Sequence, residues 1–171
     1  MHNTAMRRKR ESAVVTEAYA GGAISGKVLD FGCGCGADVE WLAEEGFSVK
    51  GYDPNTPKFA KCPRGKFDTV LCTYVLNVLE DPKPVLEEAW AKVRKGGHLV
   101  VTVRGTSDVN YHAKKGCWLK RGKGWINSRG SYQRGYTLPE LTRLCTGLPC
   151  DRMSMYSTKV NGNPMIVVVK L

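Results

Sequence analysis

The chain has 171 residues, of which 42% are hydrophobic, with a mean hydropathy of -0.31 and a formal net charge of +10. This length predicts a single domain, residues 1–171, that can bury a sizeable core, and the apolar runs fall short of the roughly 20 residues that span a bilayer. Seven scattered cysteines and an N-terminus without an apolar signal region favour a reducing, cytoplasmic location over secretion, and no membrane partner is expected.

The hydrophobic pattern, taken in chain order, alternates short apolar runs with helical periods. The predicted elements begin with a basic helical segment (1–22), a buried strand (27–31), a helix (37–45), a strand (47–53), a third buried strand and its exit (66–76), a helix from Asp81 and Pro82 to residue 94 and a strand (98–103). A basic loop (104–136), a helix capped by Thr137 and two strands (152–158 and 164–171) joined at Asn161–Gly162 complete the chain. This order predicts an α/β fold, a Rossmann-like three-layer αβα sandwich with a mostly parallel sheet and a C-terminal antiparallel hairpin.

Three glycines, Gly32, Gly34 and Gly36, stand between the first predicted strand and the helix that follows it. A backbone without side chains can turn tightly there and let a ligand approach the main chain. Asp53 ends the next predicted strand, where a carboxylate can accept hydrogen bonds from the hydroxyls of a ribose. The glycine loop and Asp53 together predict a cofactor that contains a nucleoside.

Two kinds of cofactor compete for this loop. Gly32, Gly34 and Ala37 satisfy the dinucleotide pattern G-x-G-x-x-A, so a nicotinamide-dependent oxidoreductase is one alternative. Asp30, however, stands two residues before the first glycine, where a pyrophosphate would lie. A cationic cofactor suits that carboxylate better, and S-adenosylmethionine carries a sulfonium and an amino group.

Cys33 and Cys35 alternate with the glycines, which raises the alternative that the thiols are metal ligands or redox groups. Zinc sites use cysteine pairs with two to four residues between them, as in C-x2-4-C, together with two further ligands, whereas only Gly34 separates Cys33 from Cys35. The other cysteines supply no convincing second half of such a site. The spacing therefore predicts no metal site. We interpret the two cysteines as small residues that fill the positions between the glycines.

Four stretches, "VLDFGCGCG", "VKGYDPN", "FDTVLCTYVLNVLEDP" and "VRKGGHLVVTV", resemble successive motifs of class I S-adenosylmethionine-dependent methyltransferases of the type 11/12-like domain. The resemblance covers residues 27–103 well and "YTLPELTRLC" more loosely. It implies that Asp30 and the glycine loop hold the methionine part of the cofactor and that Asp53 binds the ribose. The expected cofactor-binding residues are Asp30, Phe31, Gly32, Cys33, Gly34, Gly36, Tyr52, Asp53, Pro54, Thr73 and Tyr74.

One departure from the family pattern concerns the segment after Asp53. Only "PNTPKFAKCPRGK" separates Asp53 from the next strand, whereas most of the family places a helix and a strand there. The family's third strand is therefore expected to be lost or reduced, and adenine is expected to rest on this loop or on Tyr52 and Pro54. A subgroup associated with DNA phosphorothioation gene clusters is similar in its short link and in the stretches "RRKRES" and "RGSYQRGY", which says little about the substrate.

The basic segment 104–136 is the most informative part of the chain about an acceptor. It interleaves positive charges with aromatic rings, and its candidate nucleic-acid contacts are Lys114, Lys115, Trp118, Lys120, Arg121, Lys123, Trp125, Arg129 and Arg134. Positive charge beside stacking surfaces is typical of a nucleic-acid groove. The alternative is a solvated lid over the active site, with its aromatic side chains packed inward.

The leading hypothesis is a methyltransferase that uses S-adenosylmethionine and an unidentified acceptor, either nucleic acid or another anionic substrate. Candidate catalytic residues are Tyr74, Asn77, His112 and Tyr132. The motif (D/N/S)-PP-(Y/F), with which amino-methylating DNA enzymes hold a flipped base, does not follow the third predicted strand. The alternative is a non-catalytic module that binds S-adenosylmethionine or nucleic acid.

Overall fold

The computed structural model describes residue 8 and residues 10–171, so the other residues of the N-terminal basic segment lie outside the described part. The elements are α1 (Ala13–Ala20), β1 (Lys27–Phe31), α2 (Ala37–Glu44), β2 (Ser48–Tyr52), η1 (Pro57–Phe59), β3 (Phe67–Thr73), η2 (Leu76–Val78), α3 (Lys83–Lys92), β4 (Val93–Thr102), α4 (Thr106–Lys115), β5 (Leu119–Arg121), β6 (Gly124–Ile126), β7 (Tyr132–Gln133), α5 (Leu138–Cys145), β8 (Cys150–Ser157) and β9 (Pro164–Lys170). Among the described helices, none combines the length and the apolar character that crossing a membrane requires.

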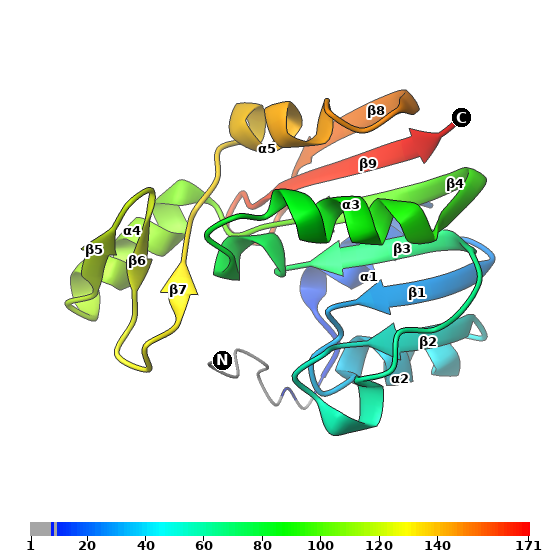
Figure 1. Cartoon of the computed structure of the whole chain (residues 1–171), viewed down its shortest axis with the longest axis horizontal. Helices are drawn as coiled ribbons and strands as arrows, with labels where there is room; N and C mark the ends of the chain where they lie inside the picture. Colours follow the sequence, from blue (N-terminus) through cyan, green and yellow to red (C-terminus); the bar gives the residue numbers. More distant parts are fainter. Residues whose placement is uncertain (1–7, 9) are drawn as a thin grey trace.

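A six-stranded sheet in the order β2-β1-β3-β4-β9-β8 forms the centre of the molecule (Figure 1). The pairs β1–β2, β1–β3 and β3–β4 are parallel, whereas β9 runs antiparallel to both β4 and β8. The predicted parallel sheet with a C-terminal antiparallel hairpin is therefore confirmed. Between Tyr52 and Phe67 the chain forms only the short 3-10 helix η1, so β2 is an edge strand and the expected loss of a strand at this point is also confirmed.

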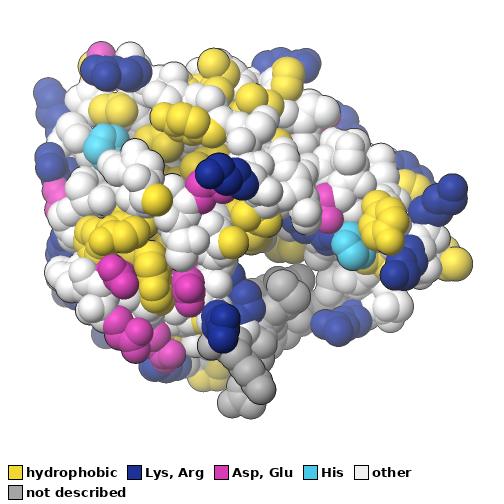
Figure 2. Space-filling view, turned by 180° about the vertical axis from the view of Figure 1, so that it is seen from behind, with side chains coloured by type: hydrophobic (Ala, Val, Ile, Leu, Met, Phe, Trp, Pro, Cys, Tyr) yellow, Lys and Arg dark blue, Asp and Glu magenta, His cyan; other side chains and the backbone are white. Residues whose placement is uncertain are grey.

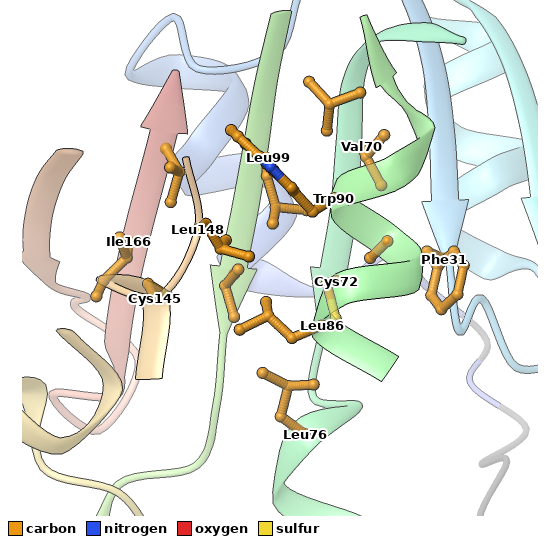
Figure 3. Close-up of a cluster of buried hydrophobic side chains, with 14 of the residues drawn as sticks. Phe31, Val70, Cys72, Leu76, Leu86, Trp90, Leu99, Cys145, Leu148 and Ile166 are labelled. Carbon is orange, nitrogen blue, oxygen red and sulfur yellow. The ribbon is translucent and has the colours of Figure 1, made fainter. Parts of the chain in front are cut away.

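Helices cover both faces of this sheet, because successive strand residues point to opposite sides. Leu99 of β4 packs in one buried cluster with Leu86 and Trp90 of α3 and with side chains of α5 (Figure 3). The next residue, Val100, belongs to a second cluster with Val14 of α1 and side chains of α2. Figure 1 shows α3 and α5 in front of the sheet and α1 and α2 behind it, which is the predicted three-layer sandwich.

Three boundaries differ from the sequence-based prediction. Within the predicted helical segment 1–22, helix α1 begins only at Ala13, since residues 10–12 are not helical and Ser12 N donates to a carboxylate of α2. Helix α3 ends at Lys92, and β4 starts at Val93, which pairs with Phe67. Val93 is fully buried, so packing against the sheet overrides the helical pattern of these residues.

The basic segment 104–136, predicted as a loop, contains helix α4 and a three-stranded antiparallel sheet, β5-β6-β7. Strands of two or three residues are too short to show an alternating pattern, which is why the prediction was wrong. The two ends of the segment meet, because Tyr136 N donates to Arg104 O at 2.9 Å and Thr106 N donates to Tyr136 O at 3.2 Å. This unit therefore stands beside the main sheet, at the left of Figure 1.

A core truncation tests the assignment of β4 to the centre of the sandwich. We expect Leu99→Ala to lower the free energy of unfolding by about 2–5 kcal/mol, because the shortened side chain leaves a cavity. Leu119→Ala is the matched control, since Leu119 is 72% exposed, and it should change stability by less than about 0.5 kcal/mol. Urea denaturation followed by circular dichroism measures both, and equal losses would contradict the described packing.

Candidate functional site

The glycine loop connects the carboxyl end of β1 to the start of α2. Gly32, Gly34 and Gly36 all have positive φ angles, of 86°, 55° and 90°, which residues with a Cβ adopt only under strain. A Cβ on Gly36 would lie 2.6 Å from the ring of Phe59, and a Cβ on Gly32 would overlap a methyl group of Val75. Backbone conformation therefore requires glycine at all three positions, as the predicted tight turn implies, and close packing adds to this requirement at Gly32 and Gly36.

Asp53 follows β2 and ties its loop to the glycine loop. Its Oδ2 accepts a hydrogen bond from Gly34 N at 2.9 Å, and its Oδ1 accepts one from Asn55 N at 2.9 Å. The residue is only 8% exposed. An ionised carboxylate offers about four acceptor positions, so capacity for two ribose hydroxyls is left after these two bonds.

Asp30 is the second-to-last residue of β1, and its side chain is buried, with the residue 2% exposed. Its Oδ2 is buried without a hydrogen-bond partner among the described residues. Burial raises the pKa of this carboxyl to about 8, helped by the negative charges of Asp38 and Asp53 and opposed by Arg8. A cationic group beside Asp30 would relieve this cost, and the sulfonium and ammonium groups of S-adenosylmethionine fit that requirement.

Asp38, in the first turn of α2, is a buried residue that the sequence analysis missed. Its Oδ1 accepts from Ser12 N at 2.6 Å, and its Oδ2 accepts from Ser12 Oγ at 3.0 Å and from Arg8 Nη2 at 2.9 Å. Asp38 thus fixes the segment before α1 against the helix that follows the glycine loop. The sequence does contain a signal for such a role, because an acidic residue in the first turn of a helix is favoured by the helix dipole.

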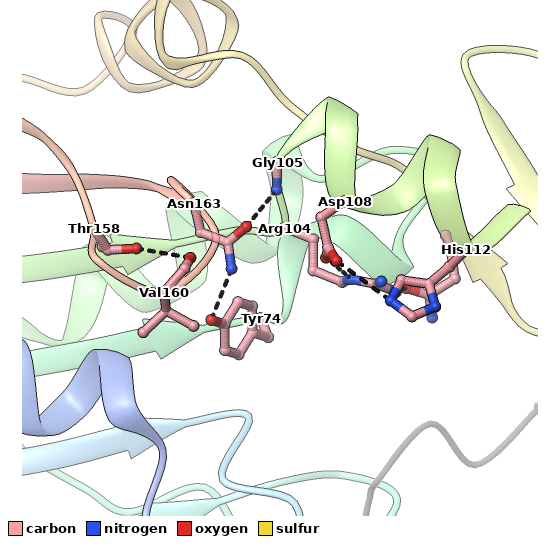
Figure 4. Close-up of polar contacts among 9 residues, drawn as sticks. Tyr74, Arg104, Gly105, Asp108, His112, Thr158, Val160 and Asn163 are labelled. Carbon is pink, nitrogen blue, oxygen red and sulfur yellow. Dashed lines mark hydrogen bonds and ion pairs between the residues drawn. The ribbon is translucent and has the colours of Figure 1, made fainter.

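Tyr74 follows β3 with a positive φ of 59°. Its hydroxyl accepts a hydrogen bond from Asn163 Nδ2 at 3.1 Å, and Asn163 Oδ1 accepts one from Gly105 N at 2.9 Å (Figure 4). Asn163, which the sequence analysis also missed, therefore joins the exits of β3 and β4 to the start of β9. Burial raises the pKa of Tyr74, which disfavours a phenolate there.

The expected cofactor-binding residues fall at the carboxyl ends of three adjacent strands. Asp30, Phe31, Gly32, Cys33, Gly34 and Gly36 lie in or after β1, Tyr52, Asp53 and Pro54 at the end of β2, and Thr73 and Tyr74 at the end of β3. Phe31 and Tyr52 contact edge to face, with ring centroids 5.1 Å apart. The structure thus gathers these residues on one rim of the sheet.

The cysteines take no part in a metal cluster among the described residues. Cys33 is 4% exposed and lies against Gly51, while Cys35 is exposed. Burial raises the pKa of Cys33, so its thiol is held in the neutral form. This environment favours neither metal ligation nor nucleophilic attack.

His112, a candidate catalytic residue, lies on α4 beside a carboxylate. Its Nε2 is 3.5 Å from Asp108 Oδ1, and Asp108 Oδ2 accepts from Arg104 Nε at 2.7 Å (Figure 4). Asp108 and His112 line a cavity of about 460 Å³ together with Tyr111 and Asn161. Figure 2 shows a hollow on this face with charged and histidine side chains at its edge.

This cavity is adjacent to the rim of the sheet. Asn161 lines it from the hairpin, two residues before the Asn163 that binds both Tyr74 and Gly105. Gly105 in turn precedes the helix that supplies the other lining residues. Hydrogen bonds through Asn163 thus connect Tyr74 to Gly105, the N-cap of the helix that carries His112.

Of the other two candidate catalytic residues, Asn77 follows the exit of β3 and Tyr132 lies in the small sheet. Asn77, in η2, is 2% exposed, its Oδ1 is buried and unpaired within the described structure, and its carbonyl accepts from Arg134 N at 2.7 Å. Tyr132 belongs to the small sheet, where it pairs with Ile126 and its ring packs against Gly124.

The comparisons with known proteins agree with this geometry. The sheet order and the glycine loop after its first strand match the Rossmann-like fold of solved methyltransferases, and the family model assigns the chain to the methyltransferases, the class that uses S-adenosylmethionine. The chain belongs to the family described as "Methyltransferase domain", whose model matches residues 6–146. The nicotinamide-dependent alternative is therefore wrong.

Among curated proteins, the ubiquinone biosynthesis O-methyltransferase of Cronobacter sakazakii is 30% identical over 124 residues, which cover 58% of this chain and 48% of that protein. The enzyme of the same name from Cupriavidus pinatubonensis is 26% identical over 164 residues, covering 79% of this chain and 64% of that protein. The chain spans about half the length of the first of these relatives and somewhat under two thirds of the second.

Among solved structures, the 1,6-didemethyltoxoflavin-N1-methyltransferase of Burkholderia thailandensis, with its acceptor and S-adenosylhomocysteine bound, has a TM-score of 0.65 and 18% identity, covering 98% of this chain and 79% of that one. The magnesium protoporphyrin IX methyltransferase of Synechocystis PCC 6803, with S-adenosylhomocysteine bound, has a TM-score of 0.60 and 20% identity, covering 93% and 81%. At these identities the likeness concerns the fold.

The glycine loop yields a direct test. We expect Gly32→Ala to weaken S-adenosylhomocysteine binding by at least about tenfold, because its Cβ would overlap Val75 and strain a positive φ angle. Cys35→Ala, three residues away and exposed, should stay within about twofold of the wild type. Calorimetry measures both affinities, thermal unfolding checks that the variants fold, and equal losses would contradict the glycine-based account.

Proposed function

We propose that this chain transfers the methyl group of S-adenosylmethionine to an oxygen or nitrogen nucleophile of a small organic acceptor. The observation that carries the proposal is the buried carboxylate of Asp30 beside the glycine loop, whose Oδ2 has no hydrogen-bond partner among the described residues, because it calls for a cationic cofactor. Membership of the methyltransferase domain family independently supports the use of S-adenosylmethionine for methyl transfer.

In this proposal, different residues on the rim of the sheet bind different parts of the cofactor. Asp30 and the loop amides and carbonyls hold the methionine part, and Asp53 accepts hydrogen bonds from the ribose hydroxyls. Tyr52 and Pro54 supply the surface for adenine, since β2 is an edge strand and no further strand flanks it. When bound, the cofactor supplies a methyl group on a positively charged sulfur.

His112 is the proposed general base. As the acceptor's nucleophile bonds to the methyl carbon, the carbon–sulfur bond breaks and its electron pair stays on sulfur, so a proton must leave the acceptor. Asp108 faces Nε2 of His112, which leaves the other ring nitrogen to take that proton, and the carboxylate then stabilises the imidazolium. Arg104 keeps Asp108 in place through its 2.7 Å hydrogen bond.

The cavity beside His112 supports a small acceptor. This cavity of about 460 Å³ is open to solvent, since the side chain of His112 is 49% exposed, so a small organic molecule can reach His112 from outside. The ubiquinone and toxoflavin methyltransferases that the chain is similar to are named for small-molecule reactions. A nucleic-acid acceptor is the second candidate, because segment 104–136 carries exposed lysines and arginines next to aromatic side chains.

Methyl transfer from labelled cofactor tests the proposal. The protein is incubated with methyl-labelled S-adenosylmethionine and separate pools of phenols, amines, DNA, RNA and protein, and we expect label in the small-molecule pools. His112→Gln should lower kcat by about 10²–10⁴-fold while S-adenosylhomocysteine affinity stays unchanged. Lys114→Gln, on the same helix but outside the cavity, is the control and should leave kcat unchanged.

Each other outcome contradicts a defined part of the proposal. Label confined to DNA or RNA would replace the small acceptor with the second candidate. Cofactor binding without transfer to any pool would favour the non-catalytic module. Transfer that His112→Gln leaves intact would remove the general base.

A further inference from the structure

A second cavity of about 460 Å³ lies on the opposite side of α4 from the one beside His112. Its walls come from α4, from the small sheet and from the start of α5, and they include Asn110, Lys120, Lys123, Trp125, Arg134 and Glu140. Four of these belong to the basic and aromatic residues that the sequence analysis selected, so the fold gathers a subset of that dispersed set into one place.

Cross-strand pairing in the small sheet builds the aromatic wall of this cavity. Lys120 of β5 lies directly opposite Trp125 of β6, and Lys120 Nζ is 4.4 Å from the centre of the indole ring. Trp125 Nε1 donates to Asn110 Oδ1 at 3.2 Å, which fixes the indole against α4. The tryptophan is therefore held in a defined orientation at the cavity wall.

Arg134 is the ordered cation of the cavity. Its side chain is 13% exposed, its guanidinium lies 4.3 Å from the centre of the Tyr136 ring, and its Nη2 is 3.6 Å from Glu140 Oε1. Glu140 Oε2 also accepts from Thr137 N at 2.8 Å, within the capping box of α5. These contacts hold the guanidinium and the carboxylate in fixed positions.

The charges of the lining do not balance. Three cations, Lys120, Lys123 and Arg134, face one carboxylate, Glu140. Neither lysine forms an ion pair with any residue that the structure describes. Lys120 and Lys123 are exposed at the mouth of the cavity, so their two positive charges are available to an anionic ligand, and a phosphate monoester at neutral pH has a charge close to -2.

We propose that this cavity binds a small phosphate monoester that carries a planar ring. The phosphate would take the two uncompensated positive charges, and the ring would lie along Trp125. The volume, about 460 Å³, suits a ligand of that size.

This site is separate from the proposed methyl-transfer site. Thr106 and Asn110, four residues apart on α4, line the phosphate cavity, whereas Asp108 and His112 line the other one. Residues four apart lie on one face of a helix, so α4 stands between the two cavities. The phosphate site therefore goes beyond the proposed function and is tested without any transfer assay.

The arrangement favours a compact ligand over a nucleic-acid strand. Lys114, Lys115 and Arg129 lie outside the cavity, and Arg121 forms an ion pair with Glu80 at 2.9 Å. Lys120, Lys123 and Arg134 line one shared volume, which suits a compact anion, and the test below includes an oligonucleotide because further cations lie outside that volume.

Titration with phenyl phosphate tests the proposal, with S-adenosylhomocysteine present at saturation so that the rim of the main sheet is occupied. Calorimetry should show binding by the wild type, and Lys123→Glu should weaken it by about tenfold or more. Lys115→Glu makes the same change of net charge outside the cavity and should change the affinity by less than about twofold. Inorganic phosphate alone should bind more weakly than phenyl phosphate, because it lacks the ring.

Three results would overturn the phosphate site. The first is no binding of phenyl phosphate by a folded wild type. The second is an equal loss in Lys115→Glu and Lys123→Glu, which would show that surface potential alone attracts the ligand. The third is an oligonucleotide that binds when phenyl phosphate does not, which would assign the segment to nucleic acid.

Discussion

The carboxylate of Asp30 is buried, and burial makes its ionised form unfavourable. The side chain is 2% exposed, one oxygen has no partner within the described structure, and Asp38 and Asp53 add negative potential. A buried charge without compensation favours its neutral form, which is why the pKa rises to about 8. The site therefore holds a proton near neutral pH until a cation arrives. A sulfonium cofactor supplies that cation. The buried carboxylate of Asp30, which is unfavourable in the free protein, therefore attracts the cofactor by charge complementarity.

The fold sets this carboxylate beside the other elements of the site by strand pairing. Asp30 pairs with Gly51 of β2, so Asp53, two residues further on, lies beyond the end of β1 and reaches the amide of Gly34. In the described structure β2 is the edge strand of the sheet. The 3-10 helix η1 lies beside it, and Phe59 of η1 packs against Gly36 and Gly51. On the opposite side of the rim, Asn163 links Tyr74 to the start of α4, and α4 carries His112 on one face and the lining of the phosphate cavity on the other. The cofactor rim and the two cavities thus depend on the ends of a few strands and on one helix.

The sequence predicted the central sheet because its strands are apolar and are followed by glycines. It selected Asp30, Asp53 and the glycine loop as cofactor-binding candidates because they form local patterns, and their binding role stays a prediction. It did not predict α4 as a helix or the sheet β5-β6-β7, whose strands have only two or three residues. It also missed Asp38 with Ser12 and Asn163 with Tyr74. These hydrogen bonds join residues 26 and 89 positions apart, so no local pattern contains them. The convergence of Lys120, Lys123, Trp125 and Arg134 is equally a product of tertiary structure, since their spacing in the sequence is irregular.

The pH dependence of S-adenosylmethionine affinity tests the central claim about Asp30 most directly. In the free protein the raised pKa keeps Asp30 protonated below about pH 8, and binding of a cation favours the ionised form, so binding must release a proton. Calorimetry between about pH 6 and about pH 7.5 should therefore show affinity that rises several-fold per pH unit in the wild type. Asp30→Asn, which cannot ionise, should bind more weakly and without this slope. A wild-type affinity that does not change over this range, or an equal slope in Asp30→Asn, would contradict the account.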